Sequence, residues 1–129
     1  MVTVIAVGLA VAYAALRWRP FRVEVRGDSM LPALEDGDWA ITIVRPIRVG
    51  DVVVVSHPER PAFELVKRVT AMPGDVVSGG KVLASDEYWV EGDAGPSSSD
   101  SRAFGPVRRA DVKGTVVFVW WPSGRRGRV

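Results

Sequence analysis

The side chains that could activate a catalytic hydroxyl or thiol are few in this chain. It contains no cysteine, which excludes thiol catalysis, zinc–thiolate sites and a disulfide framework. It contains one histidine, His57, so a Ser/His/Asp triad would have to use that residue. The remaining route to an activated serine is a lysine whose amine is kept neutral by burial, as in the Ser–Lys variant of the triad.

His57 stands in a segment that does not suit a catalytic base. Pro58 and Pro61 follow it closely, and two prolines in so short a segment predict a loop instead of a central strand. We therefore interpret His57 as a solvated loop histidine. No group of histidines and carboxylates has the spacing of metal ligands, and we predict no metal and no cofactor.

Lys67 is the lysine whose surroundings suit a general base. Lys81 and Lys113 adjoin glycines, which predicts exposed turns. In a strand, alternate side chains share a face, so Lys67 would lie beside Leu65 and Val69. Apolar neighbours would lower the pKa of the Lys67 amine, whereas an arginine cannot serve as a base. A lysine at a sheet edge with its amine in water fits the same pattern, and these residues alone leave both interpretations open.

The rest of the chain predicts the elements that would hold these residues. From Phe21 onward, short β-branched runs alternate with turn signals such as Pro73-Gly74-Asp75, which indicates a mostly antiparallel all-β domain over residues 20–122. Strands are expected at residues 22–26, 39–44, 52–55, 63–71, 76–77, 81–83, 87–90 and 115–121, and residues 107–112 are expected to resume ordinary structure. Residues 92–105 have the composition of a flexible linker, and residues 123–129 are interpreted as a frayed basic C-terminal tail.

The first sixteen residues carry no charged side chain, and Arg17, Trp18 and Arg19 follow them. This pattern predicts a transmembrane anchor over residues 1–19. At about 1.5 Å per residue the apolar run reaches roughly 24 Å, so snorkelling arginines would have to complete a crossing of about 30 Å. A cleavable signal peptide is the alternative, because Ala12-Tyr13-Ala14 has the form of a cleavage site, although no basic residue precedes the run.

The charge pattern favours a lipid bilayer as a partner over a nucleic acid. The formal net charge is +2, and the basic residues gather at positions 17–26 and 125–128 instead of along one face. We therefore expect no nucleic-acid partner. The tryptophans are expected to pack in the core or at a membrane rim, and those concerned are Trp39, Trp89, Trp120 and Trp121.

Four ordered segments resemble those of the type I signal peptidases, the S26-type serine proteases with a Ser–Lys dyad. They are residues 25–34 (VRGDSMLPAL), 50–54 (GDVVV), 67–75 (KRVTAMPGD) and 92–105, which contain Gly92-Asp93 and SSDSR. Each is short, but their order and spacing match the family over essentially the whole chain. The resemblance implies an all-β signal-peptidase-like fold with an open substrate-binding edge, preceded by one N-terminal membrane helix.

The resemblance also implies the roles of the residues at the reacting centre. Ser29 would be the nucleophile and Lys67 its general base. The backbone N–H of Ser29 would form part of the oxyanion hole. Some members of the family add a hydroxyl side chain two residues before the serine, where this chain has Gly27, so the second oxyanion donor is assigned here only to the backbone or to water.

Further matching residues would shape the walls of the site. Ser98 would orient Lys67 by a hydrogen bond, and Asp100 and Arg102 would form an ion pair. Ala94 stands where the family commonly has asparagine, which implies a less rigid loop with the chemistry retained. The substrate-binding surface would include Met30, Leu31 and Pro32.

The resemblance implies a membrane-bound serine endopeptidase that removes signal peptides from secretory preproteins, cutting after small residues. It places the catalytic domain on the extracytoplasmic face of the cell membrane, and we expect a monomer. Arg17, Arg19 and Arg22 would instead place the domain in the cytoplasm by the positive-inside rule. We follow the family on this point.

Two other functions stay open at this stage. A dedicated maturation protease that trims one partner protein would use the same dyad. A non-enzymatic, membrane-anchored binding module could keep the fold, but it would be expected to lose Ser29 or Lys67. A self-cleaving repressor with a similar fold is disfavoured, because an apolar segment and no DNA-binding domain precedes the core.

Overall fold

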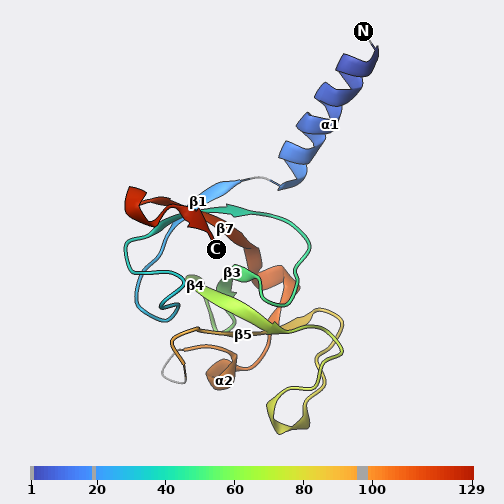
Figure 1. Cartoon of the computed structure of the whole chain (residues 1–129). Coiled ribbons are helices and arrows are strands. Elements are labelled where there is room, and N and C mark those ends of the chain that lie inside the picture. The colour runs from blue at the N-terminus through green and yellow to red at the C-terminus, as the bar shows by residue number, and fades with distance from the viewer. Residues whose placement is uncertain (1, 19, 96–98) are drawn as a thin grey trace.

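A computed structural model describes residues 2–18, 20–95 and 99–129, and it consists of a helix that projects from a curved β-domain (Figure 1). The helix α1 spans Val2–Trp18. The strands are β1 (Phe21–Glu24), β2 (Trp39–Ile43), β3 (Val52–His57), β4 (Arg60–Ala71), β5 (Glu87–Glu91), β6 (Val107–Arg108), β7 (Val112–Trp121) and β8 (Gly127–Arg128). The short helices are η1 (Ser78–Gly80), α2 (Ser101–Phe104), η2 (Arg109–Asp111) and η3 (Ser123–Arg125).

The strands form one antiparallel sheet in the order β1-β2-β7-β3-β4-β5-β6, and β8 also pairs with β7. The prediction of a mostly antiparallel all-β domain is therefore confirmed. Strands distant in sequence lie next to each other, since β7 separates β2 from β3. Curvature of the sheet (Figure 1) brings the loop after β1 against β3, since Met30 of this loop packs with Val52 and Val54.

Strand β3 lies at the centre of the sheet and is buried on both faces. Val52 and Val54 belong to a core cluster that contains Met30, whereas Val53 and Val55 belong to a second cluster on the opposite face. The alternation of side chains along a strand explains why an uninterrupted run of valines is needed here. The two clusters fix β3 and, through β3, the strand β4 that pairs with it.

The structure corrects the prediction that residues 57–61 form a solvated loop. His57 is the last residue of β3, and its half-buried ring packs against Phe104 with 4.8 Å between ring centroids. Strand β4 begins at Arg60 and contains Pro61. A proline is tolerated there because this end of β4 has no pairing on its β5 side, where the first paired residue is Arg68.

The predicted frayed tail is also wrong, because residues 123–129 form η3 and the strand β8, which pairs with Phe118 and Val119 of β7. The ordinary structure expected at residues 107–112 consists of β6, η2 and the start of β7. The linker composition of residues 92–105 was misleading as well, since the described part contains α2, whose N-terminus is capped by Asp100.

Between residues 4 and 14 the helix α1 exposes its apolar side chains, and Val4 and Leu9 are 76% and 67% exposed. Among the described residues, no helix combines the length and the apolar character that crossing a membrane requires. The anchor over residues 1–19 stays a prediction.

Candidate active site

Ser29 lies in the loop of residues 25–38 that connects β1 to β2. The two ends of this loop are paired, because Val25 N–H donates to the Asp38 carbonyl and Gly37 N–H donates to the Val25 carbonyl, both at 2.8 Å. Met30 and Leu34 anchor the loop in the core, with 1% and 0% of their surfaces exposed. Ser29 itself is half-buried, so its hydroxyl sits at the surface of a fixed loop.

Lys67 is the buried basic residue of strand β4. Only 2% of its surface is exposed, and it stands opposite Val53 of β3, on the face that also buries Val69. Within residues 2–18, 20–95 and 99–129, its amine has no hydrogen bond and no ion pair. Burial lowers the pKa of Lys67, because the charged form loses its hydration.

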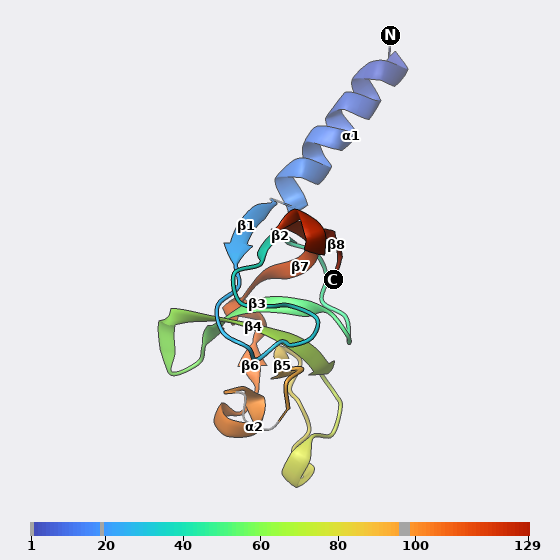
Figure 2. The same ribbon diagram turned by 60° about the vertical axis from the view of Figure 1, so that its left-hand side comes forward.

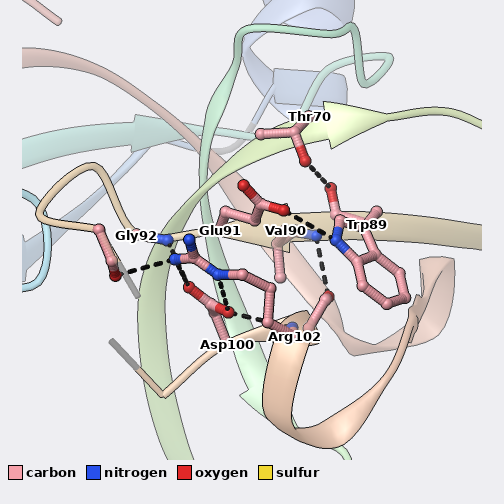
Figure 3. A network of polar contacts seen from close by, with 9 residues as sticks. Thr70, Trp89, Val90, Glu91, Gly92, Asp100 and Arg102 are labelled. Atoms are coloured by element: carbon pink, nitrogen blue, oxygen red, sulfur yellow. Dashed lines mark hydrogen bonds and ion pairs between the residues drawn. The ribbon is translucent and has the colours of Figure 1, made fainter. Parts of the chain in front are cut away.

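Asp100 and Arg102 modulate the charge of Lys67 from the next segment. After the effect of burial, the carboxylate of Asp100 raises the pKa of Lys67 and the guanidinium of Arg102 lowers it. Asp100 and Arg102 form an ion pair with each other, and Asp100 also accepts hydrogen bonds from the N–H groups of Gly92 (2.9 Å) and Arg102 (3.0 Å) (Figure 3). Burial alone would raise the pKa of Asp100, but these hydrogen bonds outweigh it and lower that pKa, so Asp100 stays ionised.

The network in Figure 3 connects α2 to β5. The buried hydroxyl of Ser101 accepts a hydrogen bond of 2.9 Å from Val90 N–H, and Trp89 Nε1 donates to Glu91 at 3.0 Å. Arg102 also donates to the Gly95 carbonyl at 2.9 Å. These contacts hold residues 92–95 and the start of α2 in place beside β4.

Arg68 holds the same segment from the other side. Its guanidinium makes a two-pronged ion pair with Asp93, with distances of 2.9 and 2.8 Å, and a third bond of 2.8 Å to the Gly50 carbonyl. Ala94 N–H then donates to the Ser29 carbonyl at 2.9 Å. The four sequence segments therefore meet at one place. Sequence reasoning missed the ion pair between Arg68 and Asp93 and the hydrogen bond between Ala94 and Ser29. The available signal was that Arg68 and Asp93 directly follow Lys67 and Gly92 in the matched segments.

Ser29 and Lys67 face the same space. One groove is lined by residues 23–26, by residues 64–67 and by Ser29, Met30 and Val54. A second hollow, which shares Ser29 and Lys67 with the groove, is also lined by Gly27, Asp28, Ala94 and Ser99. The two side chains therefore stand where the groove and the hollow meet.

The groove lies between two strand edges that have no strand partner on that side. Within the described residues, β1 pairs only with β2, and residues 64–67 of β4 pair only with β3, because the pairing of β4 with β5 begins at Arg68. Main-chain N–H and C=O groups along both edges are therefore available to an extended peptide.

Only some of the other predicted site residues that the structure describes lie at the groove. Ser98 lies outside the described residues. Gly27 N–H donates to Asp36 Oδ1 at 2.7 Å, so it is occupied and cannot serve as an oxyanion donor in this conformation. In the described part of the chain the Ser29 N–H has no partner. Met30 lines the groove, whereas Leu31 and Pro32 line neither the groove nor the hollow.

Comparison with known proteins identifies the family of the chain. The family described as "Signal peptidase, peptidase S26" matches residues 1–82 and 77–121. The chain belongs to this family. The resemblance seen in its motifs is thereby confirmed, and membership supports a protease function of the signal-peptidase type.

Several members of the S26 family are similar over most of their length. Mitochondrial inner membrane protease subunit 1 of Mus musculus is 31% identical over 126 residues, which cover 87% of this chain and 76% of the relative. Subunit 2 of the protease of Danio rerio is 32% identical over 140 residues, covering 95% and 76%. Subunit 1 of Schizosaccharomyces pombe is 32% identical over 117 residues, covering 79% and 74%. Because these relatives are named as subunits, they do not support the predicted monomer.

Proposed function

We propose that this chain is a membrane-associated serine endopeptidase in which Ser29 is the nucleophile and Lys67 the general base. The observation that carries the proposal is that both residues line the same groove, with Lys67 only 2% exposed. No acidic group in the described residues lies at ion-pair distance from its amine. Such a lysine is disfavoured in its charged form, which makes its neutral amine available to a serine.

In the proposed reaction, Ser29 Oγ attacks the carbonyl carbon of the scissile peptide bond while Lys67 Nζ takes the hydroxyl proton. Lys67 then gives that proton to the leaving amine, and the N-terminal fragment stays attached to Ser29 as an ester. Water, deprotonated by the same amine, hydrolyses the ester and restores the hydroxyl. The Ser29 N–H would stabilise the oxyanion, and a donor of this kind contributes about 100- to 1000-fold in rate.

The substrate is proposed to bind as an extended strand between the edge at residues 23–26 and the edge at residues 64–67. Its main chain would pair with both edges, and alternate side chains would point into the groove. The apolar walls of Met30, Val54 and Leu65 suit small apolar side chains before the cut. Signal peptides with small residues at the cleavage site are therefore the substrate class we propose.

We propose that the domain works at a membrane surface, held there by α1. The exposed apolar side chains of α1 support this attachment, as does the shallow hollow formed by Arg22, Trp39, Trp120 and Trp121 at the end of β7. The relatives described above are named as inner membrane proteases. A cell membrane and an extracytoplasmic catalytic domain stay predictions from the family resemblance, and protection of the domain from added protease in intact cells would contradict the second.

Cleavage of a preprotein with an Ala-x-Ala site, in detergent, tests the proposed dyad. We expect the wild-type chain to cut after the second alanine, as read by mass spectrometry of the products, and Ser29→Ala and Lys67→Ala to lose at least about 1000-fold in kcat. Ser85→Ala and Lys113→Ala, both at exposed positions, are the matched controls and should keep wild-type rates. Comparable activity in either dyad variant would show that the assignment is wrong.

The breadth of specificity separates a general signal peptidase from a dedicated maturation protease. The same assay run on several unrelated preproteins should give similar kcat/KM values for a general enzyme. Cleavage of a single substrate by the wild type, lost in Ser29→Ala, would favour the dedicated protease instead. A binding module without activity would cleave none of them.

A further inference from the structure

Residues 25–38, which carry Ser29, form a loop that we call the serine loop, and its neck is the point where Val25 and Asp38 meet. The neck contains the buried carboxylate of Asp38. Its surface is 1% exposed, and its main-chain carbonyl accepts the Val25 N–H that closes the loop of residues 25–38. Its Oδ2 accepts a hydrogen bond of 2.9 Å from Glu35 N–H within the same loop. Asp38 therefore connects the two ends of the loop to its interior.

Arg125 is the cation that pairs with this carboxylate. Its Nε and Nη2 donate to Asp38 Oδ1 and Oδ2, each at 2.9 Å, across 87 positions of sequence. Its Nη1 reaches the half-exposed Glu35 at 3.1 Å. A two-pronged bond between a guanidinium and a carboxylate is among the stronger and more directional polar contacts in proteins, and breaking a buried one leaves an uncompensated charge.

Arg125 is presented by the C-terminal segment, which is itself fixed. Arg125 is the last residue of η3. The strand β8 follows it and pairs with β7, and the two strands lie side by side in Figure 2. Arg126 adds a bond of 2.9 Å from its Nε to the Trp120 carbonyl. The segment therefore attaches rigidly to the sheet and extends a single side chain to the neck of the serine loop.

We propose that Arg125 is a positioning residue for catalysis, which clamps Asp38 and thereby fixes Ser29 relative to Lys67. This inference rests on the proposed function of Ser29. The contact between Arg125 and Asp38, which we call the clamp, acts on the position of Ser29 and not on that of Lys67. Lys67 belongs to β4, whose position is fixed by pairing with β3. Inside the loop, Ser29 is flanked by the bond from Gly27 N–H to Asp36 and by the bond of 3.0 Å from Leu34 N–H to the Met30 carbonyl. If the neck opens, both flanks can shift, and a displacement of about 1 Å at a reacting group can cost about 100-fold in rate.

The main test replaces the guanidinium of Arg125 while keeping its positive charge, with Arg125→Lys, and compares it with Arg128→Lys at an exposed position of the same segment. We expect Arg125→Lys to lower kcat at least about tenfold while KM changes less than about threefold, at a temperature where every variant is folded. Hydrogen exchange should become faster in residues 25–38 and stay unchanged in β3 and β4. The pH at which activity is half-maximal should not move, because Asp100 and Arg102, not Arg125, are the charges that act on Lys67. Arg128→Lys should match the wild type in all these measurements.

Asp38→Asn provides a second route if Arg125→Lys does not fold, since it keeps the shape and an oxygen for Glu35 N–H but loses the charge. It should show the same fall in kcat, whereas Glu35→Gln, which alters the exposed partner of Arg125, should not. A kcat within twofold of wild type in Arg125→Lys or Asp38→Asn, with unchanged exchange in residues 25–38, would overturn the clamp. A wild-type chain that cleaves no preprotein would overturn the proposed function, and the catalytic role of Arg125 with it.

Discussion

The carbonyl of Ser29 accepts a hydrogen bond of 2.9 Å from the N–H of Ala94. This bond joins the serine loop to the segment after β5, which Arg68 and Arg102 hold against β4. The segment therefore transmits the position of β4, which carries Lys67, to the loop that carries Ser29. A main-chain contact of this kind does not depend on the side chain at position 94, which explains how alanine can stand where the family commonly has asparagine.

Removal of the Ala94 N–H donor should impair catalysis. We expect Ala94→Pro, which lacks the N–H, to lower kcat by about tenfold or more, because the constraint on Ser29 is lost. Ala94→Ser and Ala94→Asn keep the donor and should stay within about threefold of the wild type. Steady-state kinetics on the preprotein substrate checks both expectations, and equal kcat values for the proline and serine variants would contradict them.

The charges of Asp100 and Arg102 should shift the pH profile in opposite directions. Activity is expected to fall as pH drops through the pKa of Lys67, because the protonated amine cannot act as a base. Arg102 lowers the pKa of Lys67 and Asp100 raises it. Arg102→Gln should therefore move the acid limb of kcat/KM to higher pH, and Asp100→Asn should move it to lower pH. Arg109→Gln is the control, and shifts of the same sign in the two variants would refute the assignment of Lys67 as base.

Lys67 should also lower the free energy of unfolding of the chain. Its pKa is lower in the folded state than in the unfolded state, so the unfolded state binds more protons between the two pKa values and stability rises with pH over that window. Lys67→Met removes the buried amine and should raise the free energy of unfolding by about 1 kcal/mol or more at pH 6. The gain should shrink toward pH 10, where the wild-type amine is neutral in more of both states. Urea denaturation at the two pH values measures it, with the exposed Lys113→Met as a control that should change little.

The strands of the fold could be predicted from local sequence patterns, whereas the pair Ser29 and Lys67 needed the order of the motifs. The valines of β3 and the alternation around Lys67 depend on which face each side chain occupies, and a strand's period of two encodes this directly. The alternation predicted that Lys67 and Val69 share a face, and the structure shows that both are buried there. The order of the motifs added the association of Lys67 with Ser29, which local patterns do not contain.

The parts that sequence reasoning missed depend on contacts between distant residues. Residues 123–129 have the composition of a free basic end, but Arg125 finds a buried partner in Asp38, 87 positions away. Residues 92–105 have the composition of a linker, but Asp93 pairs with Arg68 across 25 positions. Charged and small residues carry no apolar periodicity, so nothing local distinguishes an exposed charge from one that pairs in the folded state.

Gly114 should be the least replaceable glycine of the central sheet. It lies in β7 opposite Val54 of β3, where a β-carbon would come within 2.8 Å of Thr42 Cγ2 and 2.9 Å of the Ile43 carbonyl oxygen. The carbonyl belongs to the paired strand β2 and cannot move without disturbing the sheet. Gly114→Ala should therefore lower the free energy of unfolding by about 1–3 kcal/mol. Gly124→Ala, where the added carbon would meet nothing within 4 Å, should change it by less than about 0.5 kcal/mol. Chemical denaturation of the two variants checks this, and equal stabilities would mean that β2 and β7 can separate at this point without cost.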